Sequence, residues 1–122
     1  MTEPKKILIV EDDLILSMLN NRFVKLLGHS VVKSVKSGEE AVNFATENTI
    51  DLILMDVRLK GKMDGIEAMT EINKVKEVPV IYITGNSDVE TKKRAEATNM
   101  MAFCVKPLSY EELELIIGRV NQ

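Results

Sequence analysis

Short apolar runs alternate with helix-like segments along the whole chain, and this alternation limits the possible fold more than any other feature. The runs are Ile7–Val10, Val31–Val35, Leu52–Met55, Val80–Ile83 and Ala102–Val105. Short runs of this kind are typical of strands that are buried on both faces. Strands that alternate with helices favour a parallel sheet with right-handed crossovers and helices on each side. We therefore expect an α/β fold with a doubly wound, five-stranded parallel sheet.

The segment after the first strand is expected to form an amphipathic helix from Leu14. Its apolar residues recur at helical spacing, which predicts one buried face. That face consists of Ile15, Met18, Leu19, Phe23, Leu26 and Leu27. Gly28 follows, and a glycine readily takes the left-handed conformation that ends many helices.

Three further helices are expected to begin where a serine is followed three residues later by a glutamate, because such a pair can form a capping box. The pairs are Ser37 with Glu40, Ser87 with Glu90, and Ser109 with Glu112. Asp64-Gly65 is expected to form a turn and the start of the third helix, which has Ile66, Met69 and Ile72 inward. The fourth helix, expected to extend to about Thr98, has few apolar residues. Asn99 is expected to end it in the left-handed conformation.

Composition argues against several kinds of site. The net charge is -3 and no Lys/Arg-rich tract is present, so neither nucleic acid nor a membrane is an expected partner. Cys104 is the single cysteine, which excludes an intrachain disulfide and suits a reducing, cytoplasmic setting. His29 is the single histidine and is expected at the surface, so a Ser-His triad has little support. No apolar run approaches transmembrane length.

Polar residues follow four of the expected strands at their carboxyl ends. These residues are Glu11 and Asp12 after the first strand, Asp56 after the third, Thr84 after the fourth and Lys106 after the fifth. In a parallel sheet all carboxyl ends lie at one edge, so these groups should converge there. Open α/β sheets bind their ligands at that edge, where the strand order reverses.

The chemistry of this edge suits a phosphoryl group and a divalent cation. Crowded carboxylates raise one another's pKa unless they share a cation, and oxygen ligands alone favour Mg²⁺. The ammonium of Lys106, the hydroxyl of Thr84 and the N–H of Gly85 could together hold an anion. A carboxylate can itself act as the nucleophile and form an aspartyl phosphate. Asp56 is the best candidate, because its strand is expected at the centre of the sheet.

Five motifs carry a resemblance to a known family. They are ILIVEDD at Ile7–Asp13, LILMD ending at Asp56, MDGIEA from Met63, YITG from Tyr82 and FCVKP from Phe103. In this order and spacing the chain resembles the receiver domain of two-component response regulators over essentially its whole length. The resemblance implies a flavodoxin-like (βα)5 fold with strand order 2-1-3-4-5. Residues 1–122 are then expected to form one receiver domain, with no output domain in this chain.

The resemblance also implies a role for each motif residue. Asp56 would be the phospho-acceptor. Mg²⁺ would be held by Asp12, by Asp56, by the backbone carbonyl of Arg58 and, through water, by Glu11. Thr84, Gly85 and Lys106 would bind the phosphate, Phe103 would be the switch aromatic, and the bond to Pro107 would be cis. The chain departs from the family in the loop after Asp56, which is longer than usual and carries Lys60-Gly61 where many members have a proline.

The expected function is that of a phosphorylated signalling switch rather than an enzyme. A histidine kinase or a histidine phosphotransfer protein would phosphorylate Asp56, and the surface of the fourth helix, fifth strand and fifth helix would then bind an unidentified downstream protein. One alternative is a Mg²⁺-dependent phosphatase with an aspartyl-phosphate intermediate, but Arg58 stands where such enzymes have a second acid. Another is an interaction module that is not phosphorylated. A flavodoxin-like redox carrier is disfavoured, because acids follow the first strand.

Overall fold

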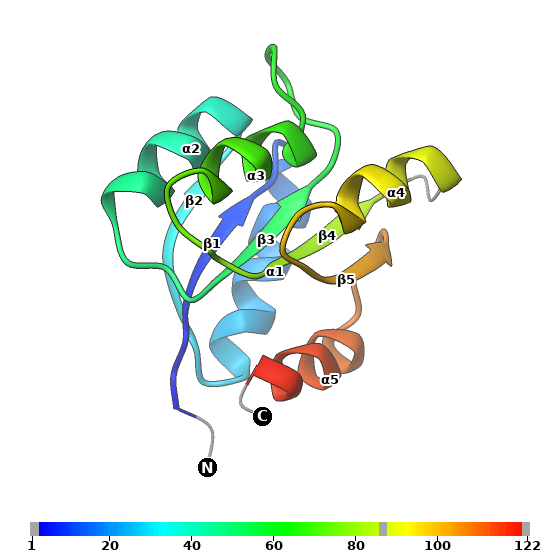
Figure 1. Cartoon of the computed structure of the whole chain (residues 1–122). Coiled ribbons are helices and arrows are strands. Elements are labelled where there is room, and N and C mark those ends of the chain that lie inside the picture. The colour runs from blue at the N-terminus through cyan, green and yellow to red at the C-terminus, as the bar shows by residue number, and fades with distance from the viewer. Residues whose placement is uncertain (1–2, 86–87, 121–122) are drawn as a thin grey trace.

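A parallel sheet of five strands forms the centre of the molecule, in the order β2-β1-β3-β4-β5 (Figure 1). The computed structural model describes residues 3–85 and 88–120, with the side chain of residue 120 left out. The strands are β1 (Lys6–Val10), β2 (Ser30–Val35), β3 (Leu52–Asp56), β4 (Val80–Thr84) and β5 (Met100–Val105). The predicted fold class and strand order are therefore confirmed.

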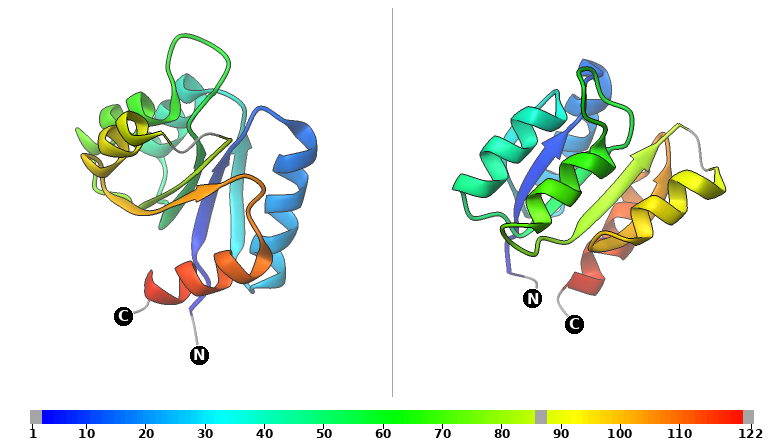
Figure 2. Two further views of the ribbon diagram at one scale, coloured as in Figure 1. Left: turned by 90° about the vertical axis from the view of Figure 1, so that its right-hand side faces the viewer. Right: turned by 45° about the horizontal axis from the view of Figure 1, so that its top comes forward.

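Helices cover both faces of this sheet, as two turned views show (Figure 2). They are α1 (Leu14–Leu26), α2 (Gly38–Glu47), α3 (Gly65–Asn73), α4 (Val89–Glu96) and α5 (Tyr110–Val120). One apolar core lies between the sheet and α2, α3 and α4, and a second lies between the sheet and α1 and α5. No helix in the two described ranges is long and apolar enough to cross a membrane.

Strand β3 shows why short apolar runs predicted this arrangement. All five of its residues are buried. Leu52 and Leu54 belong to the core beneath α1 and α5, whereas Ile53 and Met55 belong to the core beneath α2, α3 and α4. Successive side chains of a strand point to opposite faces, so a central strand between two helical layers needs apolar residues throughout. The strand leaves this environment at Asp56.

The predicted buried face of α1 is wrong for four of its six residues, Ile15, Met18, Leu19 and Leu26, which are exposed. Ile15 is 76% exposed, Met18 64% and Leu26 61%. Asn20 and Val24 are buried instead, with Phe23 and Leu27 packed partly against the core. The helix carries two apolar stripes, and periodicity alone does not tell which of them faces the sheet.

Helix starts were predicted more accurately than helix ends. Ser37 and Ser109 each accept a hydrogen bond from the backbone N–H three residues on, as a cap should. The cap of α4 is Asp88, whose Oδ1 accepts from Thr91 N, rather than Ser87, which lies outside the described residues. Asn99 is not left-handed, since no described residue other than glycine has a positive φ. Gly28 does take that conformation, with φ +86°.

His29 is buried, so its predicted position at the surface is wrong. Only 7% of the residue is exposed. Its Nδ1 accepts a hydrogen bond of 2.9 Å from Lys5 N, beside the start of β1. Burial lowers the pKa of this imidazole, and the charge of Lys5 lowers it further. The histidine is therefore a neutral structural group at the amino-terminal edge of the sheet.

Candidate functional site

Three carboxylates meet at the carboxyl edge of the sheet. β1 and β3 are neighbours, with Val10 paired to Met55, so the residues that follow these two positions come together. Glu11, Asp12 and Asp56 each offer an oxygen within 4.8 Å of the others. Glu11 and Asp56 are only 3% exposed, whereas Asp12 is half-buried. The predicted convergence of these acids is therefore present.

Lys106 provides the opposing charge. Its Nζ lies 2.9 Å from Asp56 Oδ2 and 3.2 Å from Glu11 Oε1. Its backbone N donates a 2.7 Å hydrogen bond to the carbonyl of Thr84, which fixes the chain just beyond β5. Burial alone would lower the pKa of Lys106, but its hydrogen bond to Asp56 and the charges of Asp56 and Glu11 raise it overall. Lys106 is therefore a permanent cation of the cluster.

Glu11 is the acid of this cluster whose pKa is clearly raised. Burial is the main reason that its pKa rises to about 7, and the negative charge of Asp56 raises it further. The backbone N–H of Asp13 donates to Glu11 Oε2 at 3.1 Å and opposes this rise. Near neutral pH this carboxyl therefore holds a proton for part of the time. A divalent cation could replace that proton, and the all-oxygen donor set fits Mg²⁺.

The two oxygens of Asp56 have different partners. Oδ1 accepts a 3.2 Å hydrogen bond from the backbone N–H of Arg58, and Oδ2 accepts from Lys106. The carboxylate is thus oriented by the loop after β3 and by the residue after β5. The side chain of Arg58 is exposed, so its backbone is the part that touches the cluster.

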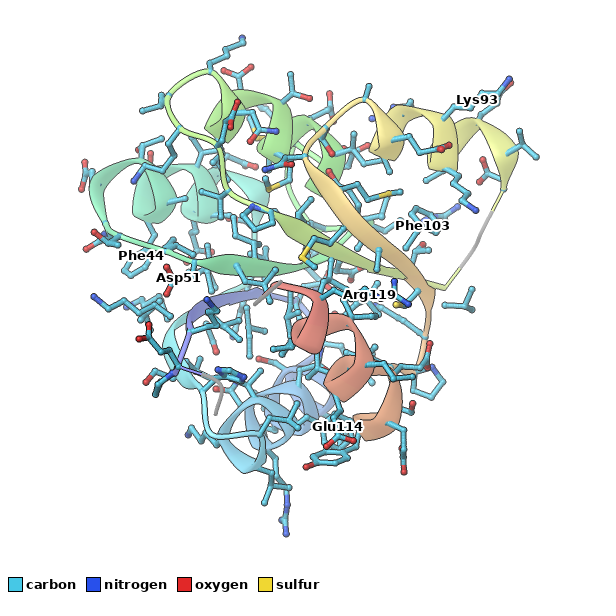
Figure 3. The ribbon with its side chains drawn as sticks, turned by 60° about the horizontal axis from the view of Figure 1, so that its bottom comes forward. Phe44, Asp51, Lys93, Phe103, Glu114 and Arg119 are labelled. Carbon is cyan, nitrogen blue, oxygen red and sulfur yellow. The ribbon has the colours of Figure 1, made fainter. Side chains whose placement is uncertain are left out.

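Of the remaining predicted residues, Thr84, Gly85 and Pro107 lie at the carboxyl edge of the sheet, whereas Phe103 lies within β5. Thr84 is 1% exposed at the end of β4, the strand next to β3, and the exposed Gly85 follows it. The Lys106–Pro107 bond is cis, the isomer that the resemblance implies. Phe103 lies within β5, where Figure 3 labels it. It is half-buried beside Tyr82, with ring centroids 6.3 Å apart.

Gly65 contributes to the site, although the sequence suggested only a turn and the start of a helix. A Cβ built on it would collide with the backbone carbonyl oxygen of Asp56 and with the side chain of Met55. Its N–H donates to the carbonyl of Val57 at 2.8 Å. The first turn of α3 therefore packs directly on the chain that carries Asp56. The signal in the sequence was a glycine just after the capping residue Asp64.

A second set of contacts was missed because its members are distant in the sequence. Arg94 Nη2 donates to Asp64 Oδ2 at 2.8 Å, and the Tyr82 hydroxyl lies 2.8 Å from Thr98 Oγ1. These contacts connect α4 to α3 and to β4. No periodicity or short motif predicts these two contacts, because their partners are 30 and 16 positions apart in the sequence.

Comparison with known proteins places these features in a family. The profile of the response regulator receiver domain matches residues 7–118. The transcriptional regulatory protein PdtaR of Mycobacterium tuberculosis is 32% identical over 123 residues, which cover 98% of this chain and 60% of PdtaR. The chain thus spans less than two thirds of this relative, and it covers only 25% of the regulator ZraR of Escherichia coli, at 33% identity.

Solved structures agree in fold. The receiver domain of the sensor histidine kinase PA1611 of Pseudomonas aeruginosa, with a magnesium ion in its active-site cleft, superposes with a TM-score of 0.86 at 30% identity, covering 98% of this chain and 100% of that one. A CheX–CheY complex of Borrelia burgdorferi with BeF3 and Mg²⁺ gives a TM-score of 0.89 at 25% identity, with coverage of 98% and 90%.

Proposed function

Because the chain belongs to the response regulator receiver domain family, we propose that it works by accepting a phosphoryl group on Asp56. The observation that carries this proposal is the contact of Lys106 with both Asp56 and Glu11. A buried carboxylate held between a lysine and a backbone N–H is oriented for attack rather than merely solvated. The protein is a signalling switch, and the only chemistry expected of it is transfer to and loss from its own aspartate.

The proposed transfer step uses these groups. An oxygen of Asp56 attacks the phosphorus of the donor, and a new P–O bond forms. The bond from phosphorus to the donor nitrogen or oxygen breaks, and its electron pair leaves with the donor. Lys106 then turns from the Asp56 carboxylate to a phosphoryl oxygen, and the Thr84 hydroxyl and Gly85 N–H donate to the same group.

Mg²⁺ would be held by Asp12, Asp56 and the backbone carbonyl of Arg58, with Glu11 acting through water. When bound, it would offset the negative charge of the phosphoryl group. The support within this chain is the crowded oxygen cluster and the raised pKa of Glu11. The magnesium-bound PA1611 domain adds support from a relative of the same fold.

The phosphoryl donor would be a histidine kinase or a histidine phosphotransfer protein, as is usual for the family. The switch would begin when Thr84 moves toward the phosphoryl group and Phe103 turns into the space beside it. These movements change the surface formed by α4, β5 and α5, to which a downstream protein would bind. Contacts made only in the phosphorylated state shift the population between the two surfaces.

Acetyl phosphate with Mg²⁺ provides the direct test. Intact-mass measurement should show one added phosphoryl group on the wild type and none on Asp56→Asn. The matched control is Asp13→Asn, because Asp13 is exposed and caps α1, a role that asparagine fills equally well. An unchanged wild-type mass, or an acid-stable phosphate, would contradict the proposal.

A further inference from the structure

Helix α4 is attached to the fold by little apolar surface. Of its residues Val89–Glu96, all of which the structure describes, Ala95 alone is buried, and Val89 is 69% exposed. In α3, by contrast, five residues are buried. Hydrophobic stabilisation scales with the apolar area removed from water. Polar contacts therefore carry a larger share of the attachment of α4 than of α3.

The first polar contact joins α4 to the start of α3. Arg94 Nη2 lies 2.8 Å from Asp64 Oδ2, with side chains 48% and 28% exposed. Asp64 is itself fixed, because its Oδ1 accepts from Glu67 N at 2.8 Å and the Glu67 carboxylate accepts from Asp64 N. The pKa of Arg94 is raised, chiefly by this hydrogen bond. The Asp64 carboxylate is therefore held in place by α3, and a movement of α4 would separate Arg94 from it.

The second contact lies beneath the carboxyl end of α4. The Tyr82 hydroxyl is 2.8 Å from Thr98 Oγ1, and Thr98 Oγ1 also donates to the carbonyl of Ala95 at 2.6 Å. Thr98 has one hydroxyl proton, so Tyr82 must be the donor of the pair. Burial is the main cause of a rise in the pKa of Tyr82 to about 12, which keeps this donor protonated.

Tyr82 also lies where the switch operates. It precedes Thr84 by two positions in β4, so both side chains point to the same face of the sheet. Its ring lies 6.3 Å from that of Phe103, its partner in the neighbouring strand β5. A displacement of Thr84 or Phe103 would therefore also move Tyr82, whose hydroxyl binds Thr98 at the end of α4.

We propose that the Arg94–Asp64 ion pair and the Tyr82–Thr98 hydrogen bond form an autoinhibitory clamp, which holds α4 in its unphosphorylated position. A hydrogen bond of 2.8 Å is lost if its partners separate by about 1 Å, so a shift of α4 must break the clamp. The clamp rests on the proposed function, since it opposes the change that phosphorylation drives. The clamp determines how often α4 leaves this position in the unphosphorylated protein. It also lowers the affinity of the site for a group that mimics phosphorylated Asp56.

Beryllofluoride with Mg²⁺ is the probe, because it places a tetrahedral group on a carboxylate as a phosphoryl group would. Linkage requires that a variant with a weaker clamp binds this probe more tightly. Calorimetric titration of Arg94→Gln should show an affinity about twofold to fivefold above wild type, the range expected for an exposed ion pair. Asp64→Asn should behave alike, since asparagine keeps the helix cap. The double variant should gain no more than either single one.

Lys93→Gln is the matched control. It removes the same charge from the same helix, and Lys93 projects into solvent (Figure 3). Amide hydrogen exchange without the probe should be faster across 89–96 in Arg94→Gln and in Tyr82→Phe than in Lys93→Gln. With saturating probe the difference should vanish, a result that simple loss of stability does not give.

The outcomes separate the two proposals. If the wild type binds beryllofluoride and Arg94→Gln binds it no better than Lys93→Gln, the clamp is refuted while the proposed function stands. Equal exchange across α4 in all variants also refutes it. If the wild type does not bind the probe with Mg²⁺, the proposed function fails and the clamp fails with it.

Discussion

Lys106 Nζ lies 2.9 Å from Asp56 Oδ2, and this contact reaches from the end of β5 across β4 to the end of β3. It joins residues that are 50 positions apart. The lysine side chain is 22% exposed and the aspartate 3%, so water screens the pair only partly. The ion pair thus orients Asp56, and in the proposed function the same ammonium also binds the phosphoryl group during transfer.

Replacing this lysine should destabilise the protein in the absence of metal. Lys106→Met leaves two buried carboxylates without their cation, and we expect a loss of about 1–3 kcal/mol in the free energy of unfolding. Protonation of Glu11 limits the loss. Urea unfolding with and without Mg²⁺ measures it, and Mg²⁺ should stabilise the variant more than the wild type. Lys93→Met is the control, and a loss of equal size there would contradict the explanation.

Asp12 should be needed for Mg²⁺ binding, whereas its neighbour Asp13 should not. Asp12→Asn should weaken Mg²⁺ binding by about tenfold or more, because a neutral amide replaces a charged ligand of a hard cation. Asp13→Asn should change it by less than about twofold, since Asp13 points away to cap α1. The rise of the melting temperature with Mg²⁺ concentration reports both affinities. Equal losses in the two variants would place the metal elsewhere.

Gly65 should tolerate no side chain. In Gly65→Ala the new methyl group meets the carbonyl of Asp56, and we expect a cost of about 1–3 kcal/mol together with slower phosphorylation. Gly118→Ala is the counterpart within α5, where a Cβ meets nothing within 4 Å. That change should stabilise the protein by up to about 1 kcal/mol through helix propensity. Chemical denaturation and the acetyl phosphate rate distinguish the two.

The buried His29 predicts a loss of stability in acid. Its pKa is lowered in the folded state from 6.5, so the unfolded chain binds more protons below that pH. The contribution of His29 is complete above about pH 6.5 and is lost as the pH falls toward the folded pKa. His29→Asn keeps an acceptor for Lys5 N but does not titrate. Unfolding free energies at pH 7.5 and 5.5 should therefore differ less in the variant than in the wild type.

Glu11 changes the free energy of unfolding with pH in the direction opposite to His29. A variant of each residue is therefore needed to separate the two effects. Its pKa rises from 4.5 to about 7 on folding, so the folded state binds more protons between these values. The stability that this protonation provides is present below about pH 4.5 and is lost as the pH rises through 7. Glu11→Gln in metal-free buffer should remove that loss. A steeper pH dependence in Glu11→Gln would contradict the assignment.

The sheet and its polar edge could be predicted because they depend on local signals. Four apolar residues before Asp56 identify a central strand, and the parallel topology then places the residues after each strand together. The starts of α2 and α5 followed from serine caps in the same way. No knowledge of long-range packing was needed for these features.

The errors concern contacts between elements. In α1 apolar residues on two faces satisfy the helical period, and only packing against the sheet leaves Val24 buried and Met18 exposed. His29 is buried next to the chain before β1, where Lys5 N donates a hydrogen bond to it. The Arg94–Asp64 pair likewise depends on the distance between two helices. These contacts form only when the helices pack on the sheet, so the sequence of a single segment does not predict them.

The hydrogen bond from Lys106 to Glu11 spans 95 positions, from the first strand to the last. No partly formed sheet can contain it. A chain that emerges from the ribosome in order acquires its carboxylates early, and they stay without their cation until β5 has docked beside β4. We therefore expect Asp56 to become competent for phosphorylation only after β5 has docked and Lys106 has reached the cluster.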